Sequence, residues 1–128
     1  MPIVRNDAAR EVPWRPGYRS YLLAGKEHGV SCTSSMSVVQ PGSGAPLHVH
    51  SDADEIIIVT KGALDFRLGD ERQIVREGHT ISIPSGTPHG FIAVGDEPAH
   101  IIAFVPRTGA FAATKYLEGG PPEGADQK

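Results

Sequence analysis

The chain has a single cysteine, Cys32, so no disulfide bond can form within it. A lone cysteine is compatible with a reducing compartment, and it is more often a small buried apolar residue than a reactive thiol. We therefore expect a cytoplasmic protein that is stabilised without covalent cross-links.

Long apolar runs are also missing. The longest, residues 56–59 and 101–105, are far shorter than the roughly 20 residues that cross a bilayer. Residues 1–17 carry five charged side chains and no apolar centre, so they do not resemble a secretory signal. The sequence predicts no membrane-spanning segment.

The chain has no excess of basic residues either. Its 12 Lys and Arg residues are outnumbered by 15 Asp and Glu residues, which gives a formal net charge of −3. Without a basic face, neither nucleic acid nor an anionic membrane is an expected partner.

What the sequence does contain is the pattern of an all-β protein. Its 128 residues suit one domain. Short runs rich in β-branched residues alternate with clusters of Pro, Gly and Asp, whereas helix signals are weak. The runs that we expect to form strands are 30–39, 56–60, 63–68, 73–75, 80–83, 90–94 and 100–105.

Three histidines and a glutamate form the most informative pattern. Alternate residues of a strand point to one side, so His48 and His50 can present two imidazoles to one point. Glu55 adds an anionic oxygen and His89 a third neutral nitrogen, a set that suits a divalent transition metal. The pattern predicts a mononuclear metal centre.

The glycines and prolines around these residues extend the pattern to nine fixed positions that resemble the two signatures of the cupin superfamily. The first signature is matched by Gly42, His48, His50, Glu55 and Gly62, and the second by Gly78, Pro84, Gly86 and His89. Two positions depart from the family pattern: Ala93 stands where Asn usually closes the second signature, and His79 where small bacterial cupins commonly carry Asp.

This resemblance implies a jelly-roll β-barrel in one domain, residues 1–128. We expect the barrel core at 31–105, an amino-terminal arm at 1–20 and a flexible tail at 118–128. The resemblance also implies one metal ion held by His48, His50, Glu55 and His89, namely iron, manganese, nickel or copper, with zinc less favoured. Because small cupins commonly pair, we expect a homodimer in which the arm packs across the interface.

Other residues receive a role from their position alone. Phe91 lies two residues from His89, so it should face the same interior and line a substrate pocket. Three further histidines, His28, His79 and His100, are expected to be solvated or locally hydrogen-bonded, and His79 is also considered as a support for the metal ligands.

Three functions remain open at this stage. The first is a metal-dependent dioxygenase acting on a small aromatic, flavonoid-like or diketone compound, with Glu55 as both ligand and catalytic proton acceptor. The second is a non-oxidative isomerase, cyclase or lyase that acts through an enolate. The third is a module that binds a small ligand without turnover. We expect dioxygenase chemistry, partly by analogy with the superfamily.

Overall fold

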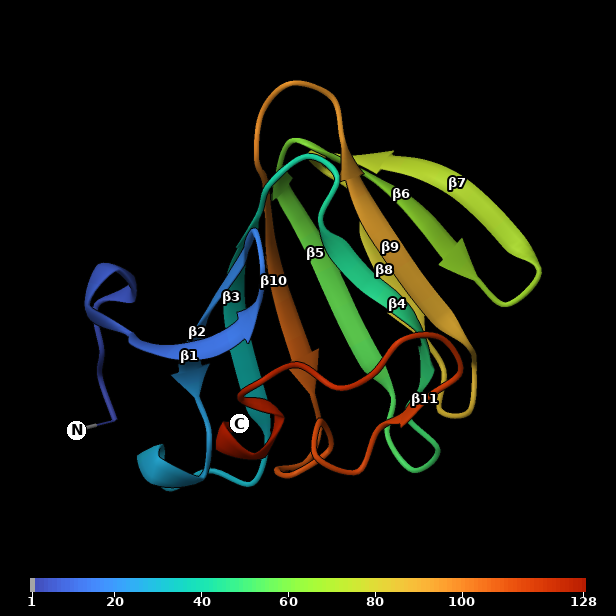
Figure 1. The fold of residues 1–128 in the computed structure, drawn as a ribbon. Coiled ribbons are helices and arrows are strands. Elements are labelled where there is room, and N and C mark those ends of the chain that lie inside the picture. Colours follow the sequence, from blue (N-terminus) through green and yellow to red (C-terminus); the bar gives the residue numbers. More distant parts are fainter. Residues whose placement is uncertain (1) are drawn as a thin grey trace.

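A computed structural model describes residues 2–128, and it consists almost entirely of antiparallel strands (Figure 1). The strands are β1 (Arg10–Arg15), β2 (Tyr18–Ala24), β3 (Thr33–Val39), β4 (Gly44–Val49), β5 (Glu55–Lys61), β6 (Ala63–Leu68), β7 (Glu71–Arg76), β8 (Thr80–Ile83), β9 (His89–Val94), β10 (Ala99–Val105) and β11 (Lys115–Tyr116). Three single-turn 3₁₀ helices accompany them: η1 (Asn6–Ala8), η2 (Lys26–His28) and η3 (Ala125–Gln127). None of the helices in the described residues has the length and apolar character that a membrane crossing requires.

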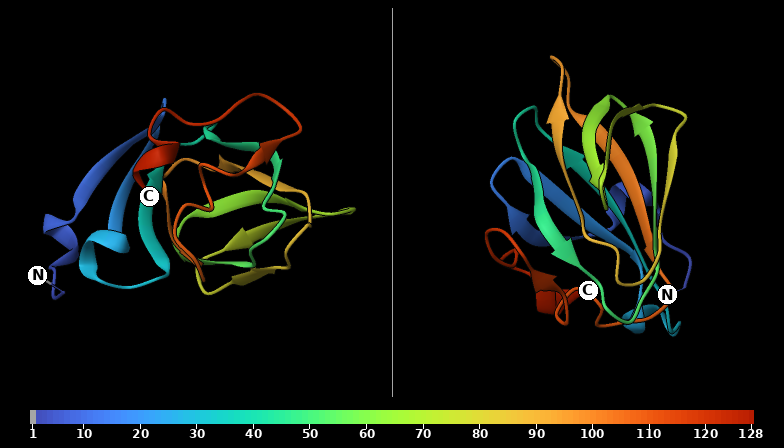
Figure 2. Two further views of the ribbon diagram at one scale, coloured as in Figure 1. Left: turned by 90° about the horizontal axis from the view of Figure 1, so that it is seen from below. Right: turned by 90° about the vertical axis from the view of Figure 1, so that its right-hand side faces the viewer.

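The strands form two sheets that face one another (Figure 2). One sheet has the order β1-β2-β3-β10-β5-β8, and the other has the order β11-β4-β9-β6-β7. Strands that are distant in sequence are therefore neighbours in space, as β10 is when it lies between β3 and β5. The expected all-β jelly-roll barrel is confirmed.

Alternation of side chains explains which face of each strand is buried. In β3 every second residue, from Thr33 to Val39, is buried, and β5 repeats this period. The inward residues of the two sheets meet in one core, where Phe66 of β6 stacks on Phe91 of β9 with ring centroids 5.6 Å apart. A second, smaller apolar cluster contains Ala53, Val105, Ala110 and Phe111.

The seven expected strands are all present, and their ends differ by no more than a few residues. The amino-terminal arm is different from our expectation, because residues 10–24 form β1 and β2 of the same chain. β1 lies at the edge of its sheet and is irregular between Val12 and Arg15, so it tolerates Pro13. That proline and the surrounding charges hide the strand pattern.

The segment that we expected to be a flexible tail, residues 118–128, packs against the barrel in this structure. Residues 117–128, the C-terminal strap, lie across the barrel and end beside β2 and β3 (Figures 1 and 2). The amide of Leu117 donates to the Leu47 carbonyl at 2.9 Å, and the amide of Glu123 donates to the Trp14 carbonyl at 2.9 Å. Arginine side chains also hold the strap, because Arg10 and Arg15 donate to the carbonyls of Gln127 and Gly120. Such polar contacts leave no periodic apolar pattern in the sequence.

Candidate metal centre

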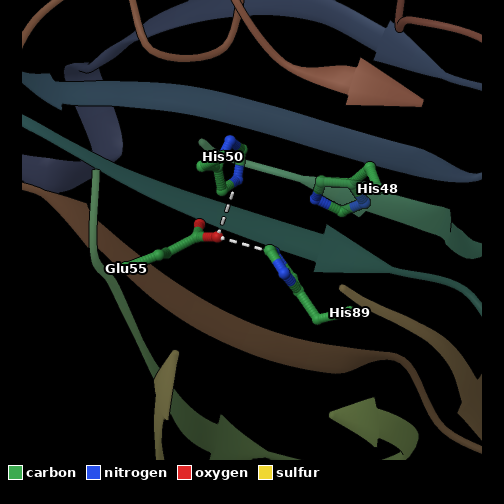
Figure 3. A group of neighbouring side chains, drawn as sticks. All are labelled: His48, His50, Glu55 and His89. Carbon is green, nitrogen blue, oxygen red and sulfur yellow. Dashed lines mark hydrogen bonds and ion pairs between the residues drawn. The ribbon is translucent and has the colours of Figure 1, made fainter. Parts of the chain in front are cut away.

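The ends of three strands, β4, β5 and β9, bring the expected ligand residues together. His48 lies on β4 directly opposite His89, the first residue of β9. Glu55 is the first residue of β5, and His50 follows the end of β4. The side chains converge on one point between the two sheets (Figure 3).

The cluster is compact and shielded from water. One ligand atom from each residue lies within 4.8 Å of those of the others, and all four residues are at most 7% exposed. The Glu55 Oε1 atom is 3.1 Å from His50 Nε2 and 3.2 Å from His89 Nε2 (Figure 3). Among residues 2–128 this is the one group of histidine and acidic side chains with such geometry.

Each imidazole is oriented by a hydrogen bond at its other nitrogen. His48 Nδ1 donates to the Pro46 carbonyl at 2.7 Å, and His89 Nδ1 donates to the Thr87 carbonyl at 2.9 Å. His50 Nδ1 is 2.8 Å from Thr114 Oγ1. The Thr114 hydroxyl donates its own proton to the Ala110 carbonyl at 2.9 Å, so it accepts from His50.

These bonds fix which nitrogen is free. A neutral imidazole that donates from Nδ1 has a lone pair at Nε2, and this is the tautomer that metal-binding histidines use. Here the Nε2 atoms of His50 and His89 face a carboxylate oxygen of Glu55. A nitrogen lone pair and a carboxylate oxygen are both hydrogen-bond acceptors, so a proton or a cation must lie between them. Three nitrogens and one carboxylate in a buried site match a divalent transition metal.

Electrostatics keep the donor set ready for a cation. Burial would raise the pKa of Glu55, but where a proton rather than a cation lies between the carboxylate and the two imidazoles, hydrogen bonds from His50 and His89 outweigh burial and lower that pKa to about 2. Burial and the neighbouring His89 lower the pKa of His48 to about 4. At neutral pH, Glu55 is therefore a carboxylate and His48 is a neutral imidazole.

Glycines let the ligand-bearing strands approach closely. A Cβ on Gly44 of β4 would lie 1.9 Å from the Phe91 carbonyl oxygen of β9, so no larger residue fits at this crossing. Gly86 has a φ of +80° in the turn before His89, and its amide donates to the His50 carbonyl at 2.8 Å. The turn expected from the Pro84–Gly86 signature thus ties His89 to His50.

A pocket opens onto the cluster. Phe91 lines it, as we expected from its spacing to His89. The remaining walls include residues that sequence reasoning did not single out as functional: Trp14, Arg15 and Tyr18 from the amino-terminal strands, and Phe111, Tyr116 and Lys128 from the carboxy-terminal segment. Both chain ends without a family signature therefore build the pocket.

Two of these residues contact the histidines directly. The Tyr116 ring stacks on His48 with centroids 5.3 Å apart, and Phe111 meets His50 edge to face at 5.7 Å. Tyr116 stacks on His48 because the two residues are paired where β11 lies beside β4. No sequence period could have found β11, because it has two residues.

The other histidines lie apart from the cluster. His79 is exposed, and its ring nitrogen bonds the backbone of Arg76 in its own turn. His28 accepts locally from the Gly25 amide. Our suggestion that His79 supports the ligands is not borne out by this geometry.

Comparison with known sequences gives matches over parts of the chain. Quercetin 2,3-dioxygenase of Bacillus subtilis is 44% identical over 50 residues, which cover 39% of this chain and 15% of the dioxygenase. Protein SchB of Streptomyces halstedii is 33% identical over 67 residues, or 52% of this chain and 49% of SchB. The chain thus spans less than two thirds of the length of each of these relatives.

Comparison with solved structures extends over more of the chain. The polyketide cyclase RemF from Streptomyces resistomycificus superimposes with a TM-score of 0.77 at 21% identity, covering 98% of this chain and 89% of RemF. KdgF from Halomonas sp. gives a TM-score of 0.70 at 24% identity, covering 80% of this chain and 93% of KdgF. These similarities establish the fold.

The family model described as "Cupin domain" matches residues 35–105, more than half of the sequence. This region contains all four residues of the buried cluster and most strands of both sheets. The chain belongs to the cupin family.

Proposed function

We propose that the chain is a metal-dependent dioxygenase of a small aromatic, flavonoid-like or diketone compound. The observation that carries this proposal is the convergence of three oriented Nε2 atoms and Glu55 at the floor of a pocket with aromatic walls. The partial identity to a quercetin dioxygenase supports the oxidative reading.

His48, His50, Glu55 and His89 would hold the ion, which is iron, manganese, nickel or copper in this proposal. When bound, such an ion supplies Lewis-acid and redox chemistry beside the pocket. The Nδ1 hydrogen bonds hold the imidazoles in the required orientation without any movement of the backbone.

The chain's own residues then have separate roles. Glu55 is ionised and lines the pocket, so it can take a proton from an enolisable substrate. Phe91 and Phe111 are buried and exclude water from the same space. Substrate oxygen atoms would thus meet a dry site with one proton acceptor.

A second candidate is a non-oxidative cyclase, isomerase or lyase that stabilises an enolate. The observation that favours it is the superposition on a polyketide cyclase, which spans both chain ends as well as the barrel. Those ends build much of the pocket. Under this alternative, Glu55 moves a proton and no oxygen is consumed.

Oxygen consumption distinguishes the two candidates. The protein is loaded with Fe²⁺, Mn²⁺, Ni²⁺ or Cu²⁺ and incubated with quercetin and with acetylacetone in an oxygen electrode, beside an anaerobic sample. A dioxygenase consumes one O₂ per substrate and is inactive without air. Product formation under nitrogen would contradict the dioxygenase and support the enolate chemistry.

We also propose that the chain forms a homodimer. The outer face of β5 and β10 exposes Ile56, Ile58 and Phe104, each 38–41% exposed, and Phe104 lies opposite Ile56 in the sheet. Apolar side chains that gather on one face support association. Light scattering gives the molar mass of the native protein and of Ile58→Lys. We expect a dimer for the native protein and a monomer for the variant, and a monomeric native protein would contradict the proposal.

A further inference from the structure

Arg15 stands out among the arginines of the chain. Six of the other seven form ion pairs with carboxylates, namely Arg5, Arg10, Arg19, Arg67, Arg72 and Arg107, and the seventh, Arg76, is exposed to solvent. Arg15 has no such pair among the described residues; its Nη2 donates to the Gly120 carbonyl at 2.7 Å. Its Nε atom is buried and has no hydrogen-bond partner in residues 2–128.

A buried donor without a partner is unfavourable unless a ligand supplies the acceptor. The Arg15 side chain lines the same pocket as His48 and Glu55. The guanidinium fork suits two oxygens of a carboxylate, with which it forms charge-assisted hydrogen bonds. The pocket therefore offers an anion-binding group away from the metal cluster.

The charges of the pocket also favour an anionic ligand. Its basic side chains are Arg15 and Lys128, whose pKa burial lowers to about 7, and its one carboxylate side chain is Glu55. Because Glu55 belongs to the cluster, a divalent ion there would leave the pocket with a net positive charge. Such a site favours anionic ligands over neutral ligands of the same shape.

Tyr116 contacts both binding groups. Its ring centroid is 5.3 Å from the guanidinium carbon of Arg15 and 5.3 Å from the ring centroid of His48. A single aromatic ring thus links the arginine to the cluster. The two distances place the Arg15 guanidinium carbon no more than about 11 Å from the His48 ring centroid, a span that a one-ring ligand can bridge. Trp14, Phe91 and Phe111 provide apolar walls for such a ligand.

We propose that Arg15 selects the substrate, which is a flat, ring-sized acid with metal-binding oxygens at one edge and a carboxylate at the other. This inference rests on the proposed function, because the first edge is assigned to a metal held by the cluster. Arg15 is thus a substrate-binding residue that holds the carboxylate. In this structure Lys128 enters the pocket and leaves little free space, so the acid displaces its side chain on binding.

The test compares two probes that differ in charge alone at the distal edge. Titration calorimetry measures binding of 3,4-dihydroxybenzoate and of 3,4-dihydroxybenzamide to the metal-loaded protein. We expect the acid to bind at least tenfold more tightly than the amide. Arg15→Gln should weaken binding of the acid about 10- to 100-fold and leave amide binding and metal content unchanged.

Three controls make the result specific. Arg19→Gln removes an exposed arginine from the same hairpin and should change nothing. Arg15→Lys keeps the charge without the fork and should restore part of the acid preference, which covers the case in which Arg15→Gln does not fold. Lys128→Gln tests the other cation of the pocket and should retain the acid preference.

Equal binding of acid and amide to the native protein, or no binding of either to native protein that is shown to hold metal, would overturn the inference. It would also be overturned if Lys128→Gln lost the acid preference while Arg15→Gln kept it. Both probes carry the same catechol, so their difference reports on the distal edge. A native protein that holds no metal would instead contradict the proposed function, and the acid-to-amide ratio of that protein would still report on Arg15.

Discussion

Replacement of Thr114 by valine removes the hydroxyl that orients His50 and leaves the shape of the side chain almost unchanged. Thr114 Oγ1 is 2.8 Å from His50 Nδ1 and 2.9 Å from the Ala110 carbonyl. In the variant the buried His50 Nδ1–H loses its acceptor, and the ring can adopt the other tautomer. That tautomer places a proton on Nε2, where the metal would bind.

The expected loss of metal affinity can be judged from other metal sites in which a hydrogen bond orients a histidine ligand. Loss of a hydrogen bond to a ligating histidine lowers metal affinity about 10- to 100-fold, equivalent to about 1.4–2.7 kcal/mol. The other two imidazoles keep their backbone acceptors, Pro46 and Thr87, so the site should weaken without being lost.

The assay is a competition titration in which a chelator of known affinity competes for Co²⁺ with the native protein and with each variant. Thr87→Val is the matched control, because Thr87 holds His89 through its carbonyl and the side chain makes no hydrogen bond in the described structure. We expect the control to bind like the native protein. Equal affinities for Thr114→Val and Thr87→Val would refute the orienting role of the hydroxyl.

Three further predictions concern charge, packing and pH. Glu55→Gln should reduce metal affinity less than loss of His50 does, yet lower turnover at least about 100-fold because the proton acceptor is gone; full activity would exclude that role. Gly44→Ala should destabilise the fold by about 1–3 kcal/mol in urea titrations, since its Cβ meets the Phe91 carbonyl at 1.9 Å, whereas Gly120→Ala, with open space around it, should be neutral. The metal-free protein should lose thermal stability as the pH falls from 6.5 to about 4. His48 has a pKa of 6.5 in the unfolded chain and of about 4 in the folded protein, so between these values protonation favours the unfolded chain. A midpoint temperature that is constant over this window would contradict the last prediction.

Sequence reasoning succeeded where a residue's role depends on local spacing. The alternation of His48 and His50 and the glycine-bounded turn before His89 depend on neighbouring residues, so both could be predicted from the sequence. The barrel followed from short β-branched runs and from the family signatures. These features require no knowledge of distant parts of the chain.

The pocket could not be predicted, because contacts distant in sequence build it. Arg15 approaches Tyr116 over about a hundred residues of sequence, and Thr114 reaches His50 across 64. The C-terminal strap is held by main-chain bonds such as that from Glu123 to Trp14, which any side chain would allow. Composition alone made this segment resemble a flexible tail.

The four buried residues of the cluster should together hold one transition metal ion. Elemental analysis of protein purified without added metal or chelator tests it directly, with His50→Ala as the comparison and circular dichroism to show that the variant is folded. We predict close to one equivalent of iron, manganese, nickel or copper in the native protein and most of it absent from the variant. A native protein without metal, or with zinc retained equally in both, would contradict the claim.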